Sequence, residues 1–348
     1  MKIVKELSSI SLPITEAEYR QRPELSYSTL STYEREGFNR LDHLFDRKES
    51  PALLEGSMVD CLITGSEEEF NSLYCVADFP SIGDKEQQIA NSLYAKYHTY
   101  YSSLIEMPKE AVLLAINEAE WQKNWRDDTR VRVFLERAAI YYALKVKAGN
   151  KIVVDRKTYD RVIAMVRALK ESPATCQYFA DNDELSPIRR YYQLKFAARF
   201  DGVGYRCMMD LAYVNYEKKE IIPCDLKTSG HTEWDFPDSF IQWNYLIQSR
   251  LYWRILKANM MKDPYFKDFT LRDYRFIVVN KFTLTPLVWE FPLTQTRGTL
   301  IDANGKEYRD PFVIGKELKG YLDCKPKVPN GINLNDVNII DCLKLKGG

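Results

Sequence analysis

The stretch IIPCDLKTSG, residues 221–230, reads as a buried strand that contains an aspartate, Asp225, and a lysine, Lys227. Apolar residues lie on both sides of Asp225, so we expect the strand to be covered on both faces. Because side chains alternate along a strand, Asp225 and Lys227 project from the same face. Two buried charges are costly unless they are paired or have a function. The pattern therefore predicts either an ion pair inside a sheet or part of an active site.

The segment before this strand, residues 205–216, also alternates like a strand and contains a second acid, Asp210. A short charged turn separates the two segments, so they are expected to pair as a hairpin. A turn centred between positions 217 and 218 places Asp210 opposite Asp225, and one centred a residue later places it opposite Lys227. Either register gathers the three groups in one patch, with opposed Cβ atoms about 5 Å apart. Only the intermediate register separates them.

Two carboxylates this close repel each other, and in a low-dielectric setting one of them would tend to be protonated. A divalent cation removes the repulsion, and hard oxygen ligands suit Mg²⁺ or Mn²⁺. The lysine can then hold an attacking water or offset charge that develops on a phosphoryl group. The constellation fits metal-dependent phosphodiester hydrolysis. The alternative is a simple ion pair, which explains the same D-x-K pattern at Asp46–Lys48 and Asp155–Lys157, in turn or helix contexts.

The wider pattern predicts an α/β fold with a mixed central β-sheet flanked by helices. Strand-like alternation covers residues 188–229 and returns at 273–293, and residues 235–258 between them are expected to form one long helix. We expect one domain in four parts: a capped helix and first-helix motif at about 26–65, a helical insertion before the core strands at about 66–150, a catalytic core at about 151–295 and an irregular C-terminal segment at about 296–348.

The composition narrows the class of protein. The 49 basic and 49 acidic residues cancel, so bulk charge does not indicate a polyanion partner, although a local basic groove stays possible. No apolar run approaches the length of a membrane span, and the N-terminus lacks a signal-peptide pattern. Seven scattered cysteines without a C-x-x-C pair favour a reducing compartment. We therefore expect a soluble cytoplasmic protein that does not bind membranes.

Asp210 followed by Asp225-Leu226-Lys227 resembles the motif of the PD-(D/E)xK nuclease superfamily. The segment GSMVDCLITG, residues 56–65, is similar to the first-helix motif of RecB-like and RecE-like exonucleases; their metal ligand is usually a histidine, and this chain has Asp60. Three further matches are the Q-x-x-x-Y motif at Gln248 and Tyr252, the helix-like segment 159–179 and the overall order over residues 26–65 and 150–290.

The resemblance is strongest to phage or prophage RecE-type exonucleases and implies a restriction-endonuclease-like fold. It further implies a Mg²⁺-dependent (or Mn²⁺-dependent) exonuclease that acts on duplex DNA ends in phage-type recombination. The implied site consists of metal ligands and catalytic or supporting groups: Asp60, Asp210, Asp225 and the Leu226 carbonyl for the metal, Lys227 for the attacking water, and Gln248 and Tyr252 for supporting the site and contacting the DNA backbone.

Several further expectations follow from the resemblance. A single-strand annealing protein and a homo-oligomeric ring are expected partners, and the cysteine grouping of iron–sulfur members is absent, so no cluster is expected. The alternatives are a structure-specific or repair endonuclease on the same core, and a catalytically degenerate fold that binds DNA or protein. Trp234 and Trp243 either stack on bases or pack in the core. Some relatives place a glutamate on the first core strand, where this chain has either Gln193 or no counterpart.

Overall fold

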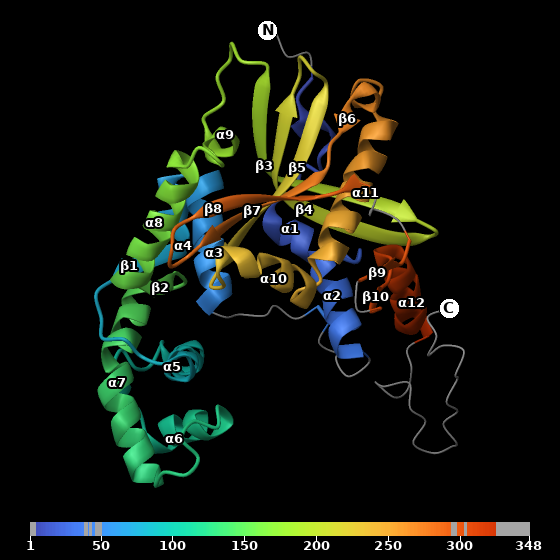
Figure 1. Cartoon of the computed structure of the whole chain (residues 1–348). Helices are drawn as coiled ribbons and strands as arrows, with labels where there is room; N and C mark the ends of the chain where they lie inside the picture. Colours follow the sequence, from blue (N-terminus) through green and yellow to red (C-terminus); the bar gives the residue numbers. More distant parts are fainter. Residues whose placement is uncertain are drawn as a thin grey trace, which may run out of the picture. The chain divides into compact units, whose positions relative to one another are not determined.

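The computed structural model of the chain describes residues 5–37, 41, 44–45, 51–293, 298–302 and 305–324. The chain divides into two compact units, whose elements are labelled in Figure 1. The sheet unit comprises Met1–Lys48 and Lys170–Gly348, and the helical unit comprises Glu49–Leu169. Among the described residues, no helix combines the length and the apolar composition that crossing a membrane requires.

A six-stranded mixed sheet forms the centre of the sheet unit (Figure 1). Its main path has the order β3-β4-β5-β7-β8, and the short β6 pairs with β5. Neighbours along the main path are antiparallel except β5 and β7, which run parallel and are joined by a helical crossover. The strands are β3 (Ile188–Phe200), β4 (Val203–Asn215), β5 (Glu220–Ser229), β6 (Thr270–Leu271), β7 (Tyr274–Asn280) and β8 (Pro286–Phe291).

Local sequence explains the first hairpin. Asp201 and Gly202 connect β3 to β4, and both have positive φ, of 48° and 82°. A two-residue turn of this kind has a twist that matches the flanking strands, and Asp-Gly is among its preferred sequences. The turn thereby fixes which residues of β3 and β4 face each other.

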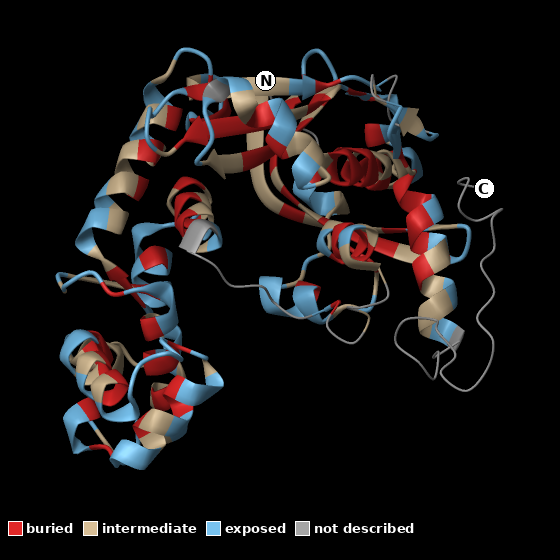
Figure 2. Ribbon diagram, turned by 60° about the horizontal axis from the view of Figure 1, so that its bottom comes forward, coloured by how far each residue is buried: buried red, intermediate tan, exposed pale blue. Residues whose placement is uncertain are grey.

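Helices flank this sheet. Helix α11 packs against β3 and β4 and also contacts α2 and α12. Figure 2 shows buried residues on the strands and on the helices that pack against them. The remaining elements of the sheet unit are η1 (Leu7–Ile10), α1 (Glu16–Gln21), α2 (Tyr27–Glu36), α9 (Cys176–Phe179), η4 (Glu233–Asp235), α10 (Phe236–Gln242), α11 (Tyr245–Lys262), η5 (Phe266–Asp268), β9 (Leu300–Ile301), β10 (Glu307–Tyr308) and α12 (Pro311–Cys324). The predicted α/β fold with a mixed central sheet is confirmed.

The helical unit precedes the core strands in the chain, as the sequence predicts. Its elements are α3 (Pro51–Thr64), α4 (Glu67–Leu73), β1 (Tyr74–Ala77), α5 (Asp84–Tyr97), η3 (Leu104–Glu106), α6 (Lys109–Glu118), α7 (Asp127–Ala148), β2 (Ile152–Asp155) and α8 (Arg156–Glu171), the last of which runs into the sheet unit. A separate core includes Ile89, Phe134 and Tyr142. The parallel pair of β1 and β2 was not predicted, because four-residue strands are too short to show a period.

The prediction of one long helix over residues 235–258 is wrong at its centre. Asn244 has a left-handed backbone with φ of 55°, and it separates α10 from α11. Asparagine reaches this conformation more easily than most residues, so the break costs little. The resulting change of direction leaves the Trp243 carbonyl oxygen available, and it accepts a hydrogen bond of 2.6 Å from the Tyr27 hydroxyl.

The prediction of an irregular C-terminal segment is also wrong over its described part, which contains β9, β10 and α12. Pro311 begins α12, a position where its missing N–H costs nothing. Asp310 accepts a hydrogen bond of 2.9 Å from the Phe312 N–H and ion-pairs with Arg250 and Arg254 of α11. The two ion pairs join residues that are distant in the sequence, so the local sequence does not reveal them. Residues 325–348 lie outside the described part.

Candidate active site

Asp210 and Asp225 lie on neighbouring strands, one residue beyond the last pair of the β4–β5 ladder, which is Leu211 opposite Cys224. Continuing this register by one step would bring Asp210 opposite Asp225. The N–H of Leu226 donates a hydrogen bond of 3.0 Å to Asp210 Oδ2. The side chain of Asp210 therefore reaches across the hairpin and lies beside the D-x-K segment.

Asp225 is almost fully buried, with 1% of its surface exposed. Gln248 Nε2 donates a hydrogen bond to its Oδ1, and the ammonium group of Lys227 ion-pairs with its Oδ2. A buried carboxylate is tolerated only when its oxygens have such partners. Because Gln248 comes from α11, the crossover helix and strand β5 together fix the orientation of Asp225.

Lys227 is held in its charged form. Burial lowers the pKa of Lys227, but the negative charge of Asp225 outweighs this effect, and the pKa lies above its ordinary value. The Nζ atom lies 4.7 Å from the ring centroid of Tyr245, a cation–π contact, and the side chain keeps 20% of its surface exposed. A charged ammonium group donates hydrogen bonds to water or phosphate, but it cannot accept a proton.

Tyr27, at the start of α2, also belongs to the surroundings of Lys227, and the sequence did not indicate it. Its ring centroid lies 6.2 Å from that of Tyr245. Burial raises the pKa of Tyr27, and the positive charge of Lys227 partly offsets this increase. The sequence predicted a capped helix here, and Ser26 does cap α2. It gave no sign that Tyr27 lies near Lys227, because the two residues are 200 positions apart in the chain.

Both predicted residues of α11 are buried. Gln248 binds Asp225 directly, whereas Tyr252, 8% exposed, packs in the main core with its ring 6.4 Å from that of Tyr274. Burial raises the pKa of Tyr252 well above its ordinary value. Within the described residues, neither the Gln248 Oε1 atom nor the Tyr274 hydroxyl has a hydrogen-bond partner. The burial of Tyr252 suits a supporting role better than contact with a DNA backbone.

The acids of the hairpin have the chemistry of a Mg²⁺ site. Mg²⁺ usually binds through one or two carboxylates and keeps several waters, and Asp210 and Asp225 supply such a pair from adjoining strands. Across the described residues, no group of three histidine, cysteine or acidic side chains is placed to hold a metal ion. Asp60 lies on α3 of the helical unit. Its part as a ligand, like that of the Leu226 carbonyl, stays a prediction.

Strand β3 contributes a feature that the sequence did not predict. Gln193 has φ of 52° and interrupts the β3–β4 ladder at the position opposite Asp210. Before this point the residues of β4 that face the main core are Cys207 and Met209, and after it the next one is Ala212. The alternation of core-facing residues along β4 therefore shifts by one residue. Left-handed residues other than glycine cost about 1–3 kcal/mol and gather at functional sites. The strain therefore lies beside the candidate metal ligands.

The residues that follow Lys227 form a turn at the end of β5. Ser229 Oγ accepts a hydrogen bond of 3.1 Å from the His231 N–H, so this hydroxyl shapes the turn. Of the two alternatives for the tryptophans, core packing is wrong. Trp234 is 87% exposed and Trp243 is 45% exposed.

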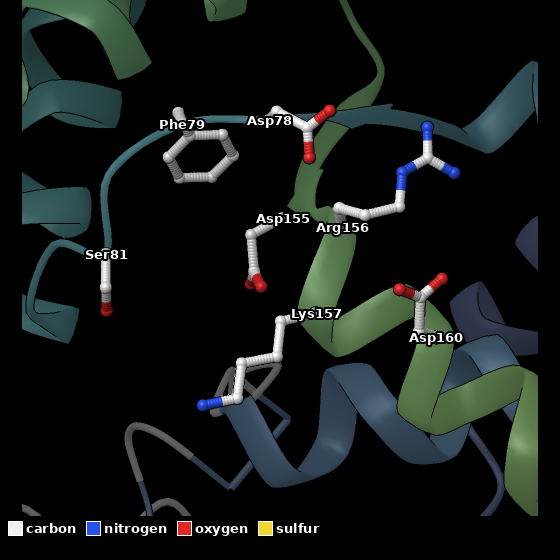
Figure 3. A pocket seen from close by; sticks show the side chains of 7 residues that line it. All are labelled: Asp78, Phe79, Ser81, Asp155, Arg156, Lys157 and Asp160. Carbon is white, nitrogen blue, oxygen red and sulfur yellow. The ribbon is translucent and has the colours of Figure 1, made fainter.

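The D-x-K pattern of Asp155–Lys157 has a different environment, shown in Figure 3. It lies in the helical unit where β2 meets α8, and Asp155 Oδ1 accepts a hydrogen bond of 2.9 Å from the Thr158 N–H, which caps the helix. Arg156 and Lys157 are exposed and project to opposite sides. In this described region no ion pair joins Asp155 to Lys157, contrary to prediction. The residues around an open pocket of about 740 Å³ are Asp78, Phe79, Ser81, Asp155, Arg156, Lys157 and Asp160.

Comparisons with known proteins leave the family open. The chain matches no protein family and no curated protein. Among solved structures it is similar to the crystal structure of a protein named "Putative exonuclease" from Eubacterium rectale, with 13% identity and a TM-score of 0.43. The match covers 97% of this chain and 99% of that chain. At this level of similarity neither a family nor an activity follows for this chain.

Proposed function

We propose that the chain is a metal-dependent deoxyribonuclease that hydrolyses phosphodiester bonds at the ends of duplex DNA. The observation that supports the proposal is the grouping of Asp210, Asp225 and Lys227 on two adjacent strands, where Asp210 accepts a hydrogen bond from the Leu226 N–H and Lys227 ion-pairs with Asp225. Three charged groups close together on two central strands need a reason.

In this proposal Asp210 and Asp225 would hold Mg²⁺ or Mn²⁺, with Asp60 and the Leu226 carbonyl as further ligands. When bound, such a cation polarises the phosphoryl oxygen and lowers the pKa of a bound water. Gln248 keeps Asp225 oriented through its hydrogen bond to Oδ1. The groups of the protein thereby hold the acids in place before any substrate arrives.

Lys227 has the role of a charged donor. Its raised pKa keeps the ammonium group protonated at neutral pH, so it cannot remove the proton of an attacking water. It can donate a hydrogen bond to that water and stabilise the negative charge that develops on the phosphoryl group. Removing one such electrostatic donor from an active site typically costs about 100- to 1,000-fold in rate.

The mode of action belongs to the proposal as well. The order of motifs resembles RecE-type exonucleases, which supports digestion from duplex ends in phage-type recombination, in the cytoplasm, with an annealing protein as partner and a ring as the assembly. The motif sets the chemistry of hydrolysis but does not choose between ends and internal sites. The experiment must therefore distinguish the proposed exonuclease from a structure-specific or repair endonuclease.

The test is digestion of linear, circular and end-blocked duplex DNA with Mg²⁺ and with a chelator. We expect wild type to degrade only the linear DNA with free ends, and only with the metal. The rate of hydrolysis should fall about 100- to 1,000-fold in Lys227→Ala. Lys157→Ala, at the exposed D-x-K pattern, should keep full activity. Circular dichroism confirms that both variants are folded, and Lys227→Arg keeps the charge if Lys227→Ala is unstable.

Three results would change the proposal. Cleavage of circular DNA would replace the exonuclease with an endonuclease on the same core. Equal activity of folded Lys227→Ala and wild type would exclude this mechanism. Digestion that continues in the chelator would exclude dependence on a metal.

A further inference from the structure

Three large aromatic side chains are exposed around the carboxyl end of β5. Trp234 is 87% exposed, Phe282 69% and Trp243 45%. Single exposed apolar residues are common on protein surfaces. These three differ because they come from three separate connections of the sheet unit: the β5–α10 loop, the β7–β8 turn and the α10–α11 break.

The first two connections are fastened to each other just beyond Lys227. The Lys281 N–H donates a hydrogen bond of 2.9 Å to the Ser229 carbonyl oxygen, and Asn280 Nδ2 donates one to the carbonyl oxygen of His231. A Cβ atom at Gly230 would lie 3.1 Å from Lys281 Cε and 3.8 Å from the Phe282 ring. The β7–β8 turn therefore lies directly against the loop that carries Trp234.

The Phe282 turn is also fixed internally. Asn280 Oδ1 accepts hydrogen bonds of 2.7 Å from the Phe282 N–H and 2.9 Å from the Thr283 N–H. Asn280 is itself buried, with 4% exposed, so a buried side chain fixes the backbone of the turn that carries the exposed Phe282 ring.

Trp243 is joined to the catalytic lysine through tyrosines. The Tyr27 hydroxyl donates to the Trp243 carbonyl oxygen, the Tyr27 ring lies near Tyr245, and the Tyr245 ring lies below Lys227. The guanidinium carbon of Arg35 lies 5.5 Å from the centroid of the Trp243 ring. On this side, Tyr245, Tyr27 and Trp243 thus lie between the cations Lys227 and Arg35.

Unpaired nucleotides fit this arrangement better than paired ones. Aromatic side chains stack on any base whose face is free, and nearby cations contact the phosphates. In a duplex the base faces are hidden within the stack. The cations beside the rings are Arg35, near Trp243, and Lys281, near Phe282.

We propose that Trp234, Phe282 and Trp243 stack on unpaired bases of the strand that leads to Asp225 and Lys227. The inference rests on the proposed nuclease function and specifies its substrate as a frayed or tailed end. The three residues hold nucleotides and are not catalytic residues. Hydrolysis would then follow local separation of the two strands, with the bases next to the scissile phosphate taken up by the aromatic rings.

The experiment measures binding in a chelator, so that no cleavage occurs. Labelled oligothymidine of about 12 nucleotides, the same strand with abasic sites, and a blunt duplex are compared by fluorescence anisotropy. Wild type should bind oligothymidine more tightly than the other two probes. The abasic strand has the same number of phosphates as oligothymidine, so a difference between these two comes from the bases. Trp234→Ala and Phe282→Ala should each bind oligothymidine with about 5- to 150-fold lower affinity than wild type. Their affinity for the abasic strand should be unchanged.

Tyr100→Ala is the matched control, because Tyr100 is an aromatic side chain 79% exposed in the helical unit. It should bind all three probes like wild type. Equal binding of oligothymidine and the abasic strand by wild type would overturn the stacking. Unchanged binding in folded Trp234→Ala and Phe282→Ala would also overturn it and assign the exposed rings to a protein partner.

The outcome is separable from that of the proposed function. If Lys227→Ala stays active while Trp234→Ala loses oligothymidine binding, the hydrolytic mechanism fails and the stacking surface stands. If Lys227→Ala is inactive while Trp234→Ala binds oligothymidine like wild type, the mechanism stands and the stacking fails.

Discussion

The same tripeptide pattern occurs in two described places with opposite environments. Asp225–Lys227 lies inside β5, where the aspartate is 1% exposed and meets Gln248 and Lys227. Asp155–Lys157 lies at the junction of β2 and α8, where the aspartate caps a helix and the lysine extends into solvent. The residue types are identical at both ends of the pattern. The position in the fold therefore determines what the charges do.

The number of neighbouring strands explains the contrast. Strand β5 lies between β4 and β7, and its Asp225 contacts Gln248 of α11. Within the described residues, β2 pairs with β1 in a two-stranded sheet, and the D-x-K pattern begins at its last residue. The charges of Asp155 and Lys157 keep their water shells, whereas those of Asp225 and Lys227 must find protein partners.

The largest expected difference between the two patterns is in activity. Asp225→Asn should lower the rate of DNA hydrolysis by at least about 100-fold. Mutating residues that merely support metal ligands already lowers metal affinity or activity by about 10- to 100-fold. Asp155→Asn should leave the rate unchanged. The measurement is the initial rate of linear duplex digestion with saturating Mg²⁺.

Folding has to be checked in the same samples, by circular dichroism and by thermal unfolding. If Asp155→Asn were as inactive as Asp225→Asn, the buried pattern would not be distinguished from the exposed one, and the assignment of the active site to β5 would be wrong. Binding of Mg²⁺ by calorimetry adds a second readout, and it should weaken only in Asp225→Asn.

The central strands and their acids could be predicted because the signal is local. Period-two alternation shows β3, β4 and β5, and a short turn limits the register to few choices, so the patch of Asp210, Asp225 and Lys227 follows. Gln248 also lies where its spacing on a helix suggested. These inferences need only the order of residues within one hairpin and one helix.

The rest depends on contacts between distant segments. Tyr27 reaches Lys227 from the far N-terminal side of the chain, and the left-handed Gln193 depends on how β3 and β4 bend together. The break at Asn244 was hidden because asparagine also occurs within helices. In each case tertiary structure overrides a local preference, and a single sequence carries no sign of it.

The next difference concerns stability. Lys227→Met leaves the buried Asp225 without its cation and should lower the free energy of unfolding by about 3–5 kcal/mol. Lys157→Met, at an exposed position, should change it by less than about 0.5 kcal/mol. Urea denaturation measures both. The double variant Asp225→Asn/Lys227→Met removes both charges and should recover most of the loss while remaining inactive.

The double variant is the informative control. Recovery of stability without activity separates the cost of an unpaired charge from the loss of a catalytic group. If Lys227→Met unfolded no more easily than Lys157→Met, Asp225 would not depend on the lysine, and the ion pair would contribute nothing to the sheet.

A smaller effect is expected from pH. The pKa of Lys227 is raised in the folded protein, so its stabilising contribution is fully present below the unfolded value of about 10.4. It is lost only as the pH rises above that value and through the folded pKa. The difference in unfolding free energy between wild type and Lys227→Met should therefore stay constant from about pH 7 to 10 and shrink above it.

The charged-donor role can be tested by the pH dependence of hydrolysis with Mg²⁺. A decline between about pH 7 and 9 that disappears in Lys227→Arg would show a lysine of lowered pKa and contradict the charged-donor role.

The smallest expected difference lies in the aromatic contacts of the two patterns. Lys227 stands 4.7 Å from the Tyr245 ring centroid, and the guanidinium carbon of Arg156 stands 5.6 Å from that of Tyr159. Cation–π contacts are worth about 0.5–1 kcal/mol when exposed and about 2 kcal/mol when water is excluded. Double-mutant cycles with Lys227→Met and Tyr245→Leu, and with Arg156→Met and Tyr159→Leu, isolate each coupling from the packing of the rings. The first coupling should exceed the second by about 1 kcal/mol; equal values would mean that water reaches Lys227 as freely as it reaches the α8 junction, and the buried pattern would then differ from the exposed one only in its ion pair.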